Sequence, residues 1–158
     1  MWLILALMLV AVAQDASPAR LTAGDLAAYR LTAPLFTQYR AAAAGVAAAV
    51  AADARYREAP LFTRDVVLSD DAGESAGALL RRLEADPRLA AAIMSAGLTP
   101  REFTTITLVL VGARLAHGFV ESGAIRRLPA GAPAENVAFV GGHLDEVVDV
   151  LRLLDIEL

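Results

Sequence analysis

The feature that most constrains the fold is a complete helix signal between residues 98 and 123. Thr99 is a favourable N-cap residue, and Pro100 suits the first helical position because its missing N–H needs no partner there. Glu102 follows Thr99 by three residues, so its side chain can bond back to the cap and complete a capping box. Gly123 stands where a helix commonly ends. The stretch therefore predicts one long helix.

Apolar side chains cover most sides of this predicted helix. Spacings of three and four residues form a stripe along one face: Phe103, Ile106, Leu110, Ala113, His117 and Val120. Only a narrow strip is polar: Thr104, Thr107, Arg114 and Glu121. A helix that is apolar on most sides is enclosed by other helices. Its uninterrupted apolar part, Ile106–Ala113, is far shorter than the roughly 20 residues of a membrane span, so we interpret it as the core helix of a soluble domain.

Helix signals recur before this stretch. A second capping pattern predicts a helix from about Ala23, which Pro34 must kink or divide before it enters the alanine run 41–54. Residues 55–69 then lose helical periodicity, and their charges alternate in sign, which is typical of a solvated surface. We expect this connection to pack three apolar side chains over the bundle: Leu61, Phe62 and Val67.

Three further segments complete the predicted helices. An acidic start predicts a helix over residues 70–85, and Asp-Pro predicts a short helix over residues 86–97. The last helix runs from about 137 to 155, and Gly141–Gly142 in its middle suggests a bend or the close approach of a neighbouring helix. No alternating strand pattern occurs. We therefore predict an all-α fold, a bundle of about four main helices plus a short one, as a single domain over residues 14–158.

The N-terminal residues 1–13 form an apolar run that ends in Ala11-Val12-Ala13, a small-x-small pattern typical of signal-peptidase sites. We predict a cleaved signal peptide and a periplasmic or secreted protein. The amino terminus is the only positive charge before this run, which leaves an uncleaved membrane anchor as an alternative. Thirteen residues span a bilayer poorly. Membrane contact is therefore expected only if this segment is retained.

Composition excludes several classes of function. The net charge is −4, so no basic face for nucleic acid is expected. All 14 basic residues are arginine, and alanine is very frequent, a bias that we attribute to a GC-rich bacterial genome. The absence of cysteine excludes disulfides, thiolate metal sites, a thiol nucleophile and covalently attached haem.

The only histidines, His117 and His143, define the one conceivable metal or haem site. Glu121 follows His117 by four residues and Glu146 follows His143 by three, spacings that bring side chains together on a helix. Di-iron bundles use Glu-x-x-His motifs, and none is present. We favour a hydrogen-bonded core role for His117 and a boundary position for His143, and expect no cofactor. A metal-binding or haem-binding bundle remains an alternative.

No catalytic residue is predicted. Neither Ser75, Ser95 nor Ser122 lies in a G-x-S-x-G context. The last helix is acidic through Asp145, Glu146, Asp149, Asp155 and Glu157, which we interpret as a solvated face that a basic partner could use. The sequence thus favours a non-enzymatic module that binds a protein partner on this helix or an apolar ligand between helices. An envelope-anchored structural protein is a further alternative.

Two segments resemble a loose group of exported bacterial helical proteins without assigned activity. They are AGLTPREF at 96–103 and LPAGAPAENVAFV at 128–140, a capped helix start and a proline-rich turn. The resemblance implies only the all-α fold class. It transfers no functional residue to this chain.

Overall fold

The computed structural model describes residues 21–63, 72–129 and 131–158. These residues form eight helices and no strand, which confirms the predicted all-α class. The helices are α1 Ala23–Ala28, α2 Ala33–Ala51, α3 Arg55–Glu58, α5 Ala72–Ala85, α6 Pro87–Ser95, α7 Pro100–Glu121, α8 Ala134–Gly142 and α9 Leu144–Leu153. The cleavage site near Ala13, Val67 and the acidic start at Asp70 lie outside the described residues.

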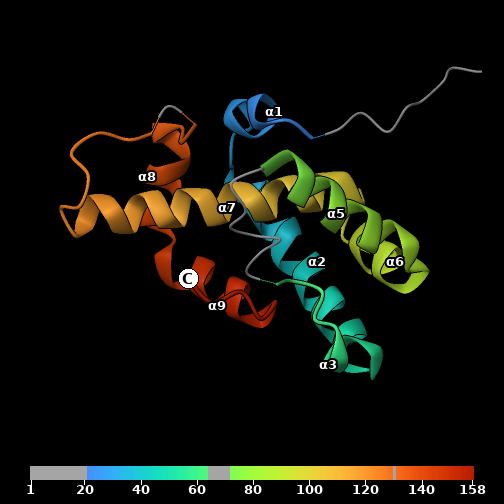
Figure 1. Ribbon diagram of the computed structural model, residues 1–158. Helices are drawn as coiled ribbons and strands as arrows, with labels where there is room; N and C mark the ends of the chain where they lie inside the picture. The colour runs from blue at the N-terminus through green and yellow to red at the C-terminus, as the bar shows by residue number, and fades with distance from the viewer. Residues whose placement is uncertain (1–20, 64–71, 130) are drawn as a thin grey trace, which may run out of the picture.

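The long helix α7 runs through the middle of the structure, with α1 and α8 on one side of it and α9 on the other (Figure 1). Its start agrees with the prediction: Thr99 accepts from the Glu102 N–H at 3.1 Å, and the Glu102 carboxylate accepts from the Thr99 N–H at 2.8 Å. Every residue from Phe103 to Val111 is buried. This enclosure by other helices is what a helix that is apolar on most sides requires.

The expected polar strip on α7 was wrong in its first half. Thr104 and Thr107 are completely buried. Their hydroxyls donate to backbone carbonyls four residues earlier, each at 2.8 Å, so threonine meets its hydrogen-bonding needs inside the core. At the other end of α7, Phe119 and Val120 are 50% and 44% exposed. The apolar residues of α7 extend beyond the part of the helix that other helices cover.

Within the described residues, α7 is the one helix long and apolar enough to cross a membrane. In this structure 61% of its most apolar window is buried by the rest of the chain. That degree of enclosure is typical of a core helix.

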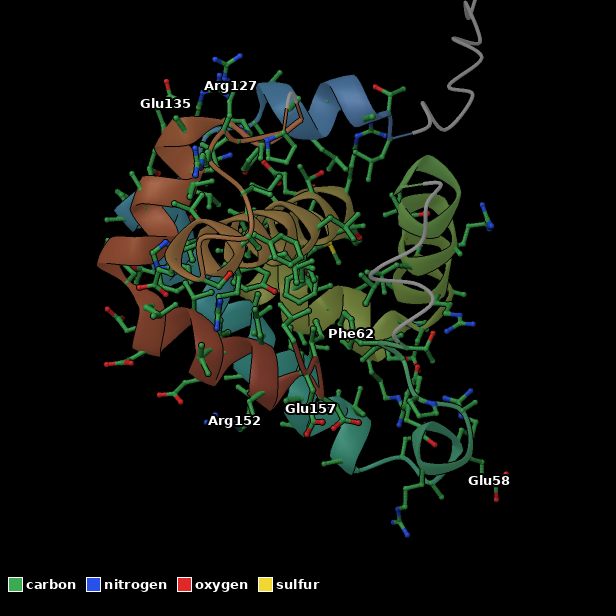
Figure 2. The ribbon with its side chains drawn as sticks, turned by 60° about the vertical axis from the view of Figure 1, so that its left-hand side comes forward. Glu58, Phe62, Arg127, Glu135, Arg152 and Glu157 are labelled. Carbon is green, nitrogen blue, oxygen red and sulfur yellow. The ribbon has the colours of Figure 1, made fainter. Side chains whose placement is uncertain are left out.

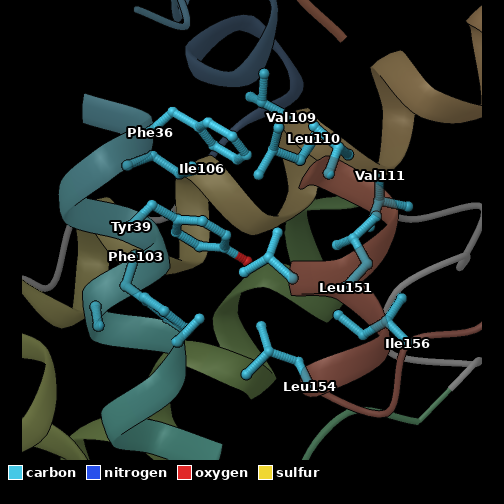
Figure 3. Close-up of a cluster of buried hydrophobic side chains, with 14 of the residues drawn as sticks. Phe36, Tyr39, Phe103, Ile106, Val109, Leu110, Val111, Leu151, Leu154 and Ile156 are labelled. Carbon is cyan, nitrogen blue, oxygen red and sulfur yellow. The ribbon is translucent and has the colours of Figure 1, made fainter. Parts of the chain in front are cut away.

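The main hydrophobic core joins α2, α7 and α9 (Figure 3). Tyr39 of α2 is fully buried and stacks on Phe103 of α7 at 5.0 Å between ring centroids. Its hydroxyl lies 2.9 Å from the Thr107 hydroxyl, which itself donates to a carbonyl, so Tyr39 is the donor. Burial raises the pKa of Tyr39 far above its ordinary value, which keeps the phenol neutral.

Two expected long helices are divided, and together with the unexpected helix α3 this explains the larger helix count. Between α1 and α2 the chain is extended before Thr32, and Pro34 lies in the first turn of α2. Of the two predicted outcomes, a kink or a division at Pro34, the structure has the division. The last helix was expected to run from about 137 to 155, with a bend or the close approach of a neighbouring helix at Gly141–Gly142. It breaks at His143, where φ is −128° and ψ is 28°, directly after Gly141 and Gly142.

The break also shows what the glycine pair contributes. A Cβ on Gly141 would lie 3.0 Å from Cε1 of His117, so the absence of a side chain leaves room for the His117 ring of α7 against α8. The prediction for the connection after α2 was also wrong in part. Leu61 and Phe62 are buried as predicted, but Arg55–Glu58 forms one helical turn rather than irregular chain.

Candidate functional site

The described residues enclose an apolar groove at the end of α2. Its volume is about 260 Å³. Eleven residues line it: Val46, Ala47, Val50, Ala51, Tyr56, Pro60, Leu61, Phe62, Leu153, Leu154 and Asp155. They come from the second half of α2, from α3 and the chain after it, and from the end of α9. Figure 2 shows Phe62 and Glu157 on the side of the molecule where α3 lies.

The alanine run creates the space in this groove. Ala47 and Ala51 alternate with Val46 and Val50 on the groove side of α2, and a larger side chain at either alanine would fill the volume. The opposite wall is held in place by Tyr56, whose hydroxyl donates to the Asp86 carboxylate at 2.8 Å. This hydrogen bond fixes the position of Tyr56 in a wall that is otherwise apolar.

Asp155 is the one charged residue among the eleven that line the groove. It follows α9 with φ at 61°, the left-handed region in which glycine is favoured. The N–H of Ile156 donates to Leu151 and the N–H of Asp155 donates to Arg152, each at 2.9 Å. This pattern is a Schellman motif, which normally has glycine where this chain has Asp155.

We predict that Asp155→Gly raises the free energy of unfolding by about 1 kcal/mol, because glycine removes the left-handed strain. It also removes a negative charge from the C-terminal end of a helix, where the dipole disfavours it. Urea denaturation followed by circular dichroism measures the change. Asp155→Asn is the control and should gain less, since asparagine keeps a side chain at this φ. Equal or lower stability in Asp155→Gly would show that the backbone is not strained.

A second groove, of about 330 Å³, lies between α7 and the other side of α9. Its lining mixes charges of both signs with apolar groups: Arg114, Val148, Leu151, Arg152, Ile156, Glu157 and Leu158. Arg152 is already paired with Asp149 at 3.1 Å. Because opposite charges line it together, this groove favours no single class of ligand.

An ionic cluster joins α2, α3 and α6. The carboxylate of Asp53 accepts from Arg55 at 2.7 Å and also from Arg88, while Asp86 accepts from Arg55 at 3.1 Å and from Arg88 at 3.2 Å. Asp86 also caps α6 by accepting from the Arg88 N–H at 3.0 Å, as the sequence predicted. The Arg55 side chain is exposed, as expected for a solvated surface, and its ion pairs with Asp53 and Asp86 were not predicted. Since every member is paired, the cluster is structural.

The stability of this cluster should depend on pH. Hydrogen bonds from Arg88 lower the pKa of Asp86 to about 2, and those from Arg55 lower the pKa of Asp53 as well. A lowered folded-state pKa contributes stability that is complete above the unfolded value of 3.8 and is lost as the pH falls through the folded value.

We therefore expect the free energy of unfolding to be steady from about pH 7 to 5 and to fall between about pH 5 and 2. Asp86→Asn keeps a residue that can cap α6 and should make this fall shallower. The exposed Asp145→Asn serves as the matched control. An identical slope in the wild type and Asp86→Asn would contradict the role given to the cluster.

The two histidines have separate surroundings. Nε2 of His117 lies 3.6 Å from Glu121, as the spacing predicted, and the side chain is 19% exposed. Nδ1 of His143 lies 2.9 Å from the Phe139 carbonyl, and its ring stacks on that of Phe139. The expected partner of His143 was Glu146, but Glu146 pairs with Arg40 of α2 instead.

Among the described residues no group of three or more His, Asp or Glu side chains could hold a metal ion. The metal or haem alternative through His117 and His143 stays a hypothesis. On α9 and after it, all five predicted acids are exposed: Asp145, Glu146, Asp149, Asp155 and Glu157. They form the expected solvated face, and only Asp155 of this set also lines the apolar groove.

The comparisons with known proteins add no functional residue. Family models, curated proteins and solved structures were compared with the chain, and none of the three comparisons gave a match. The resemblance to exported helical proteins therefore remains a prediction. The groove is the feature of the described residues from which a function can be argued.

Proposed function

We propose that this chain is an exported, non-enzymatic binding module whose ligand site is the apolar groove between α2 and α9. The observation that carries the proposal is the lining of the groove, in which apolar side chains surround a single charge, Asp155. Binding pockets are lined mainly by apolar side chains with a few polar groups that fix the orientation of the ligand. The groove has this composition, with Asp155 as its one charged group.

The size of the groove limits what it can hold. A volume of about 260 Å³ equals the liquid volume of about nine water molecules. Pockets that enclose drug-sized ligands measure about 300 to 1,000 Å³. The groove thus suits one apolar side chain or a short aliphatic chain.

The chemistry of the lining favours binding over catalysis. Asp155 and Tyr56 are its two titratable groups. Desolvation, followed by the hydrogen bond to Asp86, raises the pKa of Tyr56, and its proton is already committed to that bond. General acid–base catalysis needs a group that can exchange its proton near the working pH. Tyr56 is poorly suited to that task.

A methyl-resolved NMR titration with 1-hexanol tests the groove as a site for apolar groups. We expect saturable shifts confined to the lining residues. Ala47→Leu places a larger side chain in the groove and should weaken binding by about tenfold or more, since each 1.4 kcal/mol of lost binding energy is tenfold. Ala48→Leu adds the same side chain on the exposed face of α2 and is the matched control. Equal affinity for 1-hexanol in Ala47→Leu and in the wild type would contradict the proposal.

Export is the second part of the proposal and rests on residues 1–13. The short apolar run with Ala11-Val12-Ala13 fits a cleaved signal peptide better than a membrane span. We predict that intact mass spectrometry of the protein from the periplasm or medium finds Gln14 as the first residue. A protein that keeps Met1 and sediments with the membrane would support the anchored alternative instead.

A further inference from the structure

The negative charge at the rim of the apolar groove has no partner within the described part of the chain. Asp155 is exposed, and no hydrogen bond or ion pair joins its side chain to a described residue. The nearest basic residue in sequence, Arg152, is occupied by Asp149 at 3.1 Å. Arg55 and Arg88 do not line the groove, and they bind Asp53 and Asp86. Among the described residues, the carboxylate of Asp155 thus has no counter-ion.

Two local features make Asp155 costly for the fold. Its backbone is left-handed, with φ at 61°, and its charge stands at the C-terminal end of α9. Glycine would avoid both costs. Residues held at a cost in stability cluster at binding sites, where their side chains are needed.

The surface around the groove indicates the kind of occupant. Leu153 lines the groove and is 50% exposed, so apolar surface continues outward from the cavity. The cavity has room for one apolar side chain, and the chain that carries this side chain could lie across Leu153. Exposed apolar surface next to a pocket is typical of protein interaction sites.

We infer that the groove takes an apolar side chain of another protein and that Asp155 binds a lysine or arginine next to that side chain. This inference rests on the proposed function. It adds that the partner is a basic segment with an apolar residue at its centre. The acidic face of α9 has the complementary sign and would favour the approach of such a segment.

Two short blocked peptides test the inference on the full chain. One carries a leucine between two lysines and the other a leucine between two glutamates, and NMR titration measures both dissociation constants. We expect the lysine peptide to bind at least about fivefold more tightly at low salt, and the preference to shrink at high salt.

Three controls separate the possible outcomes. Asp155→Asn should abolish the preference for lysine, whereas Asp145→Asn at the start of α9 should keep the preference. Equal binding of the two peptides, or a preference that survives in Asp155→Asn, would overturn the inference. So would binding of n-hexylamine as tight as that of the lysine peptide, because the site would then hold a small amine. Failure of 1-hexanol itself would instead overturn the proposed function.

Discussion

Replacing Leu110 with alanine is expected to lower the free energy of unfolding by about 2 to 5 kcal/mol. Leu110 lies in the middle of α7 and is completely buried, so truncation leaves a cavity that rigid neighbouring helices fill only in part. Urea denaturation followed at 222 nm measures the loss. Val120→Ala on the same helix is the control, because Val120 is 44% exposed. A loss below about 0.5 kcal/mol in Leu110→Ala would show that this face of α7 is not core.

Replacing Asn136 with alanine should cost about 2 to 4 kcal/mol, since it leaves one buried and one part-buried backbone group without their hydrogen-bond partner. The amide oxygen of Asn136 accepts from the Leu31 N–H at 2.9 Å, and its amide nitrogen donates to the Tyr29 carbonyl at 2.8 Å. The side chain is 1% exposed and ties α8 to the segment between α1 and α2.

Amide hydrogen exchange gives this prediction a second measurement. The Leu31 N–H should exchange much faster in Asn136→Ala, while Glu135→Ala, an exposed change one residue earlier, should leave both the exchange and the stability close to wild type. Unchanged exchange at Leu31 together with a stability loss below about 0.5 kcal/mol would contradict the bridging role of Asn136.

Signals within a few residues of each other were readable from the sequence. The capping boxes at Thr22 and Thr99, the cap at Asp86 and the break before Pro34 all depend on short spacings, and the structure confirms each of them. Local hydrogen bonding and the fixed φ of proline determine these features. They do not depend on which helices are neighbours.

Features that depend on distant parts of the chain were missed. The glycine pair predicted a bend or a close approach but not that His117 of α7 is the neighbour, and the contact between Tyr39 and the buried Thr107 was not predicted. The bridge made by Asn136 joins residues more than 100 positions apart. A polar amide inside the apolar segment 133–140 was the one signal that could have identified it.

The groove belongs to the same category. Its walls come from α2, from Leu61 and Phe62, and from the end of α9, and no sequence pattern shows that these three segments meet. The sequence indicated an apolar ligand between helices and an acidic last helix, but not that Asp155 connects the two. Only the packing of α9 against α2 makes that connection.

Binding in the groove is tested most directly by intermolecular nuclear Overhauser effects between 1-hexanol and the methyl groups of the full chain. We predict contacts from the alkyl protons to Val50, Leu61 and Leu153, which line the groove from three segments. Contacts only to Val148 and Ile156, which line the charged groove on the other side of α9, or no contacts at all, would contradict the assignment of this site.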